Sequence, residues 1–421
     1  MVAASIYFTL FISFAVEMWG YELRFYLLYV ALIPFLAWKK VLFPRGPFLF
    51  FVFFNAFSVI GSLFFCSHEL NVRFYSGSFS LLAAYSAFCM GVYISRAGYT
   101  DRAMTHVIIA GCMASIVGSF QVLSSIINLQ QLYDFLDPIW VTSAVSNAPY
   151  SYASFEDLVR GQAFFREPAH LAFYLLPSLT LSWRKKSNKS SFIIILVGFV
   201  GTFSISAFTV LMIGLIALFL VNKNFRKYVP FLTASCFVVI FTLYETSASI
   251  RVRIDSIVEV ISAGQFVYTA YSTSFEALLA GIGTIRHALL ISVGSFFFGA
   301  GRGNFSLPFE SFMEFDEAKI NSMPGLNDGG NLCTLIIGEN GIIGLGFLVV
   351  PFVFLTKRYV KSINVSEAMS CYRYRERSIY ISSFILILYN YFRYGGISFV
   401  IVWIFLGLAY GQKKLVSRDE E

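Results

Sequence analysis

Long apolar stretches separated by short polar breaks occupy most of the chain. A transmembrane helix needs about 20 apolar residues, and these stretches predict spans near that length. They lie near residues 1–18, 25–38, 47–65, 75–95, 103–127, 169–183, 191–204, 206–221, 228–245, 332–355, 378–393 and 395–411. Residues 191–221 exceed one span, so Ser204 and Ser206 predict a break there, with a single tilted helix as the alternative. The pattern predicts an all-α polytopic membrane protein with about 12 transmembrane helices.

Two segments between the apolar stretches are longer than ordinary loops. They cover residues 128–168 and 246–331, and the second contains an apolar stretch over 288–298. That stretch is too short to span, so we expect it to lie at the interface or to re-enter the membrane. The helices then fall into three groups, an N-terminal one over 1–127, a central one over 169–245 and a C-terminal one with a cytoplasmic tail over 332–421.

Composition narrows the class of protein. Hydrophobic residues make up 57% of the chain and charged residues 13%, whereas a soluble domain carries roughly 25% charged residues. The sequence therefore excludes a soluble enzyme, a disordered protein and a nucleic-acid binder. The net charge of +7 is typical of basic cytoplasmic loops in a membrane protein.

The basic residues orient the predicted spans. With the N-terminus inside, 21 of the 31 Lys and Arg residues fall in cytoplasmic loops, as the positive-inside rule requires. This places both termini in the cytoplasm and the two long segments outside. The outer basic residues are all Arg except Lys319, and Arg suits fixed contacts to phosphate or carboxylate. The alternative is that these Arg side chains pair with nearby outer acids such as Asp255 and Glu259.

The first candidate motif ends the first long segment. Arg160 and Arg166 precede Glu167, Pro168 and His170. Pro168 suits the first turn of a helix, which would place Glu167 at the positive end of the helix dipole. A carboxylate held ionised beside two guanidiniums is a candidate general base. The alternatives are that Glu167 only caps the helix and that His170 is an interfacial side chain.

The second candidate motif is the turn Gly-Ala-Gly-Arg-Gly-Asn-Phe, which contains Gly301, Arg302, Gly303 and Asn304. A dinucleotide fingerprint would need a βαβ unit around it, and none is predicted. Glycines beside an Arg can still form a loop whose backbone N–H groups face an anion. A plain turn is the alternative.

The third candidate motif is a polar loop that leads into an apolar span. The loop holds Asp328 and Asn331, and the span that follows contains Glu339. An acid within the membrane is costly and indicates a functional site. An interhelical hydrogen bond is the alternative role for Glu339.

Together the motifs resemble the O-antigen polymerase and ligase superfamily of bacterial inner-membrane proteins. The resembling parts are Arg160–Pro168, the glycine turn and the Asn331-led span with its Glu-x-Gly-Ile-Ile-Gly sequence. Arg286 falls where the family often has an Arg. Gly330 precedes Asn331 where ligases place a His, and Glu-Pro-Ala-His is more typical of polymerases, so the resemblance favours the polymerase branch.

The resemblance implies a GT-C-like glycosyltransferase with two long periplasmic loops, acting without a metal or cofactor. Such enzymes move a growing glycan from undecaprenyl diphosphate to the sugar hydroxyl of a new lipid-linked repeat unit. Glu167 would be the general base, with His170 and Asp328 in reserve. Arg160, Arg166, Arg286 and Arg302 would bind the diphosphate, and Gly301, Gly303, Asn304, Asn331 and Glu339 would support the site. A chain-length regulator protein would be a further partner.

Two other classes compete with the enzyme. A flippase for lipid-linked oligosaccharides needs contacts reachable from both faces and often shows internal repeats, and the sequence shows no repeat. A non-catalytic membrane scaffold would not need Arg, Glu and glycine-turn motifs on one side.

The predicted topology can be tested by cysteine labelling. In a cysteine-free background, we expect single cysteines at Trp140 and Glu310 to react with an impermeant maleimide in whole cells. Cysteines at Lys186 and Tyr374 should react only after lysis, because those positions are predicted to be cytoplasmic. The reverse pattern would invert the topology.

Overall fold

The structure is a computed structural model of the full chain. It describes 2–11, 15–18, 21–41, 44–65, 72–127, 154–155, 158–159, 161, 163, 165, 168–184, 189–221, 226–246, 251, 254–255, 293–299, 301–302, 332–364, 370–392 and 400–412.

Helices dominate the described residues, as the apolar pattern predicts. The main ones are α3 (Arg45–Phe65), α4 (Val72–Arg96), α5 (Thr100–Ile126), α7 (Pro168–Arg184), α8 (Lys189–Gly201), α9 (Ile205–Val221), α10 (Val229–Thr246), α13 (Val293–Phe298), α16 (Leu332–Asn364), α17 (Ser370–Phe392) and α18 (Val400–Gly411). Two short hairpins accompany them.

Four helical stretches among the described residues are long and apolar enough to cross a membrane. They are Arg45–Leu63, Gly77–Arg96, Thr100–Ser124 and Leu335–Ser362. Shorter apolar helices, α8 and α18 among them, add to these. The architecture is that of an α-helical membrane protein, while the number of twelve spans stays a prediction.

The N-terminal region differs from the prediction. Residues 1–18 were expected to form one span, but they contain α1 (Val2–Tyr7), a 3-10 helix (Phe8–Phe11) and β1 (Ala15–Met18). Strand β1 pairs with β2 (Tyr21–Arg24), and a 3-10 helix (Phe25–Leu32) then leads into α2 (Ile33–Trp38). The apolar run reaches the acid Glu17 before it is long enough for a full span, which explains why a single helix does not form.

The predicted break near Ser204 and Ser206 is confirmed. Helix α8 ends at Gly201 and α9 begins at Ile205. Between them Phe203 has a φ of 45°, which a continuous α-helix does not allow. Helix α7 begins at Pro168, so the predicted first-turn position of this proline is also confirmed.

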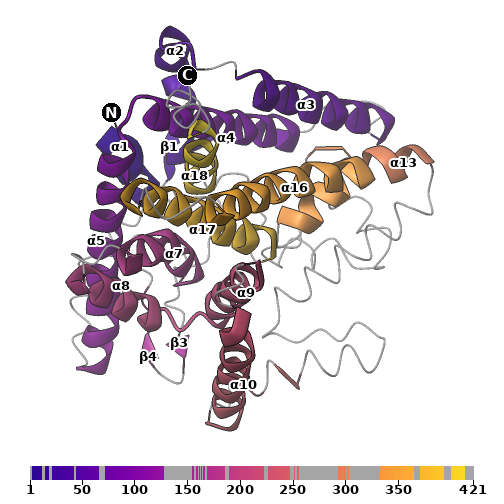
Figure 1. Cartoon of the computed structure of the whole chain (residues 1–421). Coiled ribbons are helices and arrows are strands. Elements are labelled where there is room, and N and C mark those ends of the chain that lie inside the picture. The colour runs from indigo at the N-terminus through magenta and orange to yellow at the C-terminus, as the bar shows by residue number, and fades with distance from the viewer. Residues whose placement is uncertain are drawn as a thin grey trace.

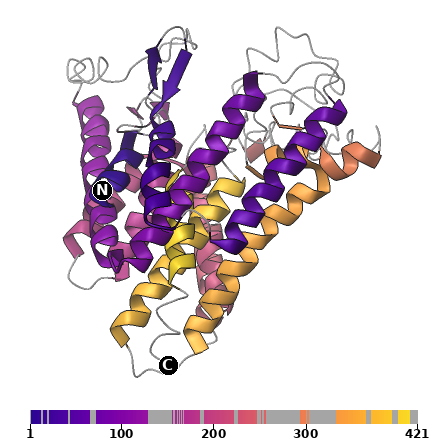
Figure 2. The ribbon, with the colours of Figure 1, turned by 90° about the horizontal axis from the view of Figure 1, so that it is seen from above.

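The helices form two neighbouring groups that share α17. Helices α3, α4, α13, α16 and α18 lie on one side, and α5, α7 and α8 lie on the other (Figure 1). Helix α17 packs against α16 and α18 and also against α7 and α9. In the second view, the β1–β2 hairpin lies at the top and α13 at the right, and the ends of α16 and α17 that follow one another in sequence lie at the bottom (Figure 2).

Opposite ends of the bundle carry different residues. Ser78 and Arg96 lie near the two ends of α4, and 18 helical residues span about 27 Å. We call the end with Ser78 the Arg302 end, because Arg302 contacts it there. We call the other end the basic end, since it gathers exposed cations at the α2–α3 and α4–α5 connections, namely Lys39, Lys40, Arg96 and Arg102.

The α4–α18 contact offers a test of this packing. A Cβ added at Gly407 of α18 would lie 2.0 Å from the Phe88 carbonyl oxygen, whereas one added at Gly346 of α16 would meet nothing within 4 Å. We expect Gly407→Ala to lower the melting temperature in detergent by several degrees, because overpacking costs roughly 1–3 kcal/mol. Gly346→Ala is the control and should melt like the unchanged protein. Equal melting of the two variants would contradict this packing.

Candidate functional site

The glycine turn after α13 packs on the first third of α16. The Gly301 amide donates a hydrogen bond of 2.9 Å to the Glu339 carbonyl oxygen. Gly301 has a φ of 81°, and a Cβ there would lie 2.3 Å from the Ser62 amide nitrogen. A glycine is therefore required at this position. The fold brings the second and third sequence motifs together through this turn.

Arg302, the next residue, points between α3 and α4 and is only 2% exposed. Its Nη1 donates to Asn55 Oδ1 at 3.0 Å and to Ser78 Oγ at 3.4 Å, and its Nη2 donates to Ser58 Oγ at 3.2 Å. The guanidinium thus ties the turn to two helices that lie more than 220 residues earlier in the sequence.

Two nearby groups partly compensate the charge of Arg302. Its Cζ lies 5.4 Å from the centre of the Phe54 ring, a distance at which a ring face attracts a cation. Burial lowers the pKa of the guanidinium, and the charge of Glu339 opposes this shift. Glu339 is itself 7% exposed. A buried cation beside a buried carboxylate in a membrane protein indicates a functional site.

Part of the guanidinium is left unused. Within the described residues, Arg302 Nε has no hydrogen-bond partner. Since a guanidinium has five N–H donors, the fork keeps bonding capacity beyond the contacts to Asn55, Ser58 and Ser78.

The sequence reading missed the amide and hydroxyl groups around Arg302. Ser58 Oγ donates to Asn340 Oδ1 at 2.5 Å while accepting from Arg302. Asn55, Ser58 and Ser62 are spaced three and four residues apart, which puts polar groups on one face of the apolar helix α3. This spacing of polar residues in an apolar helix is the sequence pattern that could have indicated Asn55, Ser58 and Ser62.

Helix α16 is broken at the site. Gly341 has φ 58° and ψ −151°, values outside the helical region, and a Cβ there would lie 2.4 Å from the Phe296 carbonyl oxygen. The break lets α13 approach the backbone of α16 beside Glu339 and Asn340. The sequence predicted a continuous span over 332–355, so this kink is a correction.

An apolar groove begins beside the Arg302 cluster. It encloses about 390 Å³ and is lined from α3, α4, α16, α17 and α18. Phe54 belongs both to the groove wall and to the contact under Arg302. Pro351, Phe354 and Tyr410 lie in the wall farther toward the basic end. The groove is suited to an extended apolar chain whose charged head lies at the Arg302 end.

The described part of the first motif packs elsewhere at the same end of the bundle. The Ala163 amide donates 2.7 Å to Gln121 Oε1 of α5, and the Gly161 amide donates 2.9 Å to the Gly201 carbonyl oxygen. Phe165 is buried. His170 lies half-buried on the first turn of α7.

Helix α17 connects the two regions. Tyr389 donates a hydrogen bond to the Ala169 carbonyl oxygen at 3.2 Å, and Tyr391 donates to the Leu348 carbonyl oxygen at 2.7 Å. Two sides of a single turn of α17 thus contact α7 and α16. Asn390 between them is buried, and within the described residues both polar atoms of its amide lack a partner.

The remaining predicted site residues lie outside the described residues. They are Arg160, Arg166, Glu167, Arg286, Gly303, Asn304, Asp328 and Asn331. Their roles stay predictions, as do those of His170 and Glu339.

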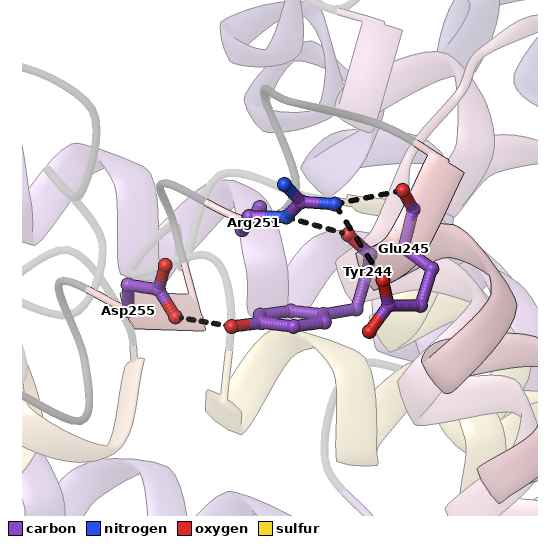
Figure 3. A network of polar contacts seen from close by, with 4 residues as sticks. All are labelled: Tyr244, Glu245, Arg251 and Asp255. Atoms are coloured by element: carbon purple, nitrogen blue, oxygen red, sulfur yellow. Dashed lines mark hydrogen bonds and ion pairs between the residues drawn. The ribbon is translucent and has the colours of Figure 1, made fainter.

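Arg251, which the sequence predicts to lie on the outer side, pairs with its neighbours. Its Nη2 lies 3.7 Å from Glu245 Oε2, and it donates to the carbonyl oxygens of Tyr244 and Glu245 (Figure 3). Tyr244 donates in turn to Asp255. The Arg251 side chain is 46% exposed, so it contrasts with the buried Arg302.

The difference in burial between Arg302 and Arg251 can be tested by substituting each with Lys. A Lys at position 302 presents one ammonium instead of a fork and cannot bond Asn55, Ser58 and Ser78 together. We expect Arg302→Lys to destabilise the protein by about 1–3 kcal/mol, the cost of unpaired buried polar groups, measured as a lower melting temperature in detergent. Arg251→Lys is the exposed control and should leave it unchanged. A similar loss in both variants would remove the special role of Arg302.

No family model matches the chain, and no curated protein matches it. The function of the chain is therefore inferred from its own residues and their geometry.

Proposed function

We propose that the chain is a polysaccharide polymerase of the bacterial inner membrane. It transfers a growing glycan from undecaprenyl diphosphate to a sugar hydroxyl of a new lipid-linked repeat unit, at the periplasmic face. The observation that carries the proposal is the buried Arg302, close to Glu339 at one end of an apolar groove of about 390 Å³.

The groove and the cation match the two parts of a polyprenyl diphosphate. An isoprenoid chain is apolar throughout, and burial of each CH₂ group contributes roughly 0.8 kcal/mol. Its diphosphate is a dense anion that guanidinium groups bind through two N–H groups at once. Phe54, which contacts both the groove and Arg302, marks the point where tail and head would meet.

The reaction needs a cation for the leaving group and a base for the acceptor. The bond between the anomeric carbon and the diphosphate oxygen breaks, and diphosphate leaves with the electron pair. The acceptor oxygen forms the new bond to that carbon and releases its proton to a carboxylate. In this proposal Arg302, with Arg160, Arg166 and Arg286, stabilises the departing charge, and Glu167 takes the proton.

The cluster around Arg302 gives the cation a fixed position. Fixed charges stabilise developing charge without reorganising during the reaction. Asn55, Ser58 and Ser78 hold the fork, and the Gly301 bond to Glu339 holds the turn. A metal ion is not required in this scheme, and a chain-length regulator is its expected protein partner.

Two alternatives make different predictions about the glycan. A ligase would transfer finished polymer from the lipid to a separate acceptor, and a flippase would move the repeat unit across the membrane. Deletion of the gene separates the three, because lipid-linked polymer accumulates without a ligase and the repeat unit stays inside without a flippase. The proposed polymerase predicts single repeat units outside the cell and no ladder.

Glu167→Gln tests the general base. Gln keeps the shape of Glu but cannot accept a proton, so we expect at least a 100-fold loss of polymer, in line with general-base catalysis. The measurement is the surface-glycan ladder on a gel, in a deletion strain that carries the variant.

The matched control is Glu245→Gln, which changes an exposed acid outside the proposed site. It should restore the full ladder, and immunoblots should show equal amounts of both variants. A normal ladder with Glu167→Gln would exclude Glu167 as the base. Accumulated lipid-linked polymer in the deletion strain would overturn the polymerase proposal itself.

A further inference from the structure

A second cavity lies at the basic end of the bundle, remote from Arg302. It encloses about 480 Å³ between α1, α2, the end of α4 and the first turns of α5. Lys39, Arg102 and His106 line it together with Trp38 and Tyr99. No acidic residue belongs to its described lining, and Asp101, beside Arg102, lies on the exposed first turn of α5.

Among the described residues, no acid pairs with the basic side chains of this cavity. In the parts of the chain that the structure describes, Lys39, Arg102 and His106 form no ion pair. Lys39 Nζ instead lies 4.1 Å from the centre of the Trp38 ring. The Tyr7 hydroxyl lies 3.3 Å from His106 Nδ1, and when Tyr7 donates there, the ring proton is on Nε2. The side chains of Lys39, Arg102 and His106 thus border the same cavity, and each can donate a hydrogen bond.

The cavity also has an apolar side. Val2, Ala3 and Phe35 complete part of its wall, and Trp38 is 74% exposed at the end of the apolar helix α2. An exposed Trp beside a Lys is typical of the membrane–water interface. A ligand that fits has a negatively charged head and an apolar body next to it.

The geometry points to a binding site for the headgroup of an anionic phospholipid in this cavity. Lys39 and Arg102 contact the phosphate, and the apolar wall contacts the glycerol and first acyl carbons. Basic pockets between helices at the cytoplasmic side are suited to such headgroups, since that leaflet carries anionic lipids. The site is independent of the proposed polymerase activity, because it lies at the other end of α4 from Arg302.

Lipid binding to the full-length protein tests the site. Native mass spectrometry in detergent would measure how many molecules of phosphatidylglycerol bind, compared with phosphatidylcholine that has the same acyl chains. We expect the unchanged protein to prefer phosphatidylglycerol. The double variant Lys39→Gln with Arg102→Gln should bind it at least tenfold less tightly, since each surface cation contributes about a factor of five. The swap Lys39→Arg with Arg102→Lys keeps both charges and should retain binding.

The control removes two cations from the same end outside the cavity. Arg96→Gln with Lys361→Gln changes two exposed side chains and should leave the preference intact. Three results would overturn the site: equal binding of the two lipids, an equal loss in the control, or displacement of the lipid by soluble glycerol phosphate at matching concentration. The last result would indicate a site for a soluble anion.

Discussion

The burial of Arg302 is the constraint on which the arrangement at one end of the molecule depends. A guanidinium cannot leave water unless its donors find acceptors and its charge finds compensation. Asn55, Ser58 and Ser78 supply the acceptors, and the charge of Glu339 offsets part of the cost of burial. These partners come from α3, α4 and α16, so satisfying one side chain fixes how a turn and three helices meet.

The backbone is adapted to the same requirement. Gly301 brings the turn against Ser62, and the break at Gly341 lets α13 approach α16. Positive φ values at both positions cost little for glycine and much for other residues. Both glycines lie beside the buried Arg302 and Glu339, so the backbone geometry that only glycine adopts readily is concentrated around these two charges.

The two cavities lie at different ends of the molecule and differ in the chemistry of their linings. The apolar groove touches the Arg302 cluster through Phe54, and the basic cavity lies at the opposite end around Lys39 and Arg102. One is suited to a long apolar chain with a diphosphate head, and the other to a shorter contact with a headgroup. Both hypotheses treat lipid as a ligand, and each depends on a separate set of side chains.

The sequence alone determined the helical membrane class and the positions of α3, α4, α5 and α16, because these follow from the lengths of the apolar stretches. It also determined the break between α8 and α9 and the start of α7 at Pro168, because these follow from local backbone chemistry. It also singled out Arg302 and Glu339. It failed for residues 1–18, where a short apolar run forms a helix and a strand instead of a span. The tertiary structure decided that Asn55, Ser58 and Asn340 surround Arg302. Contacts between residues more than 200 positions apart depend on how helices pack, and no local pattern encodes that packing.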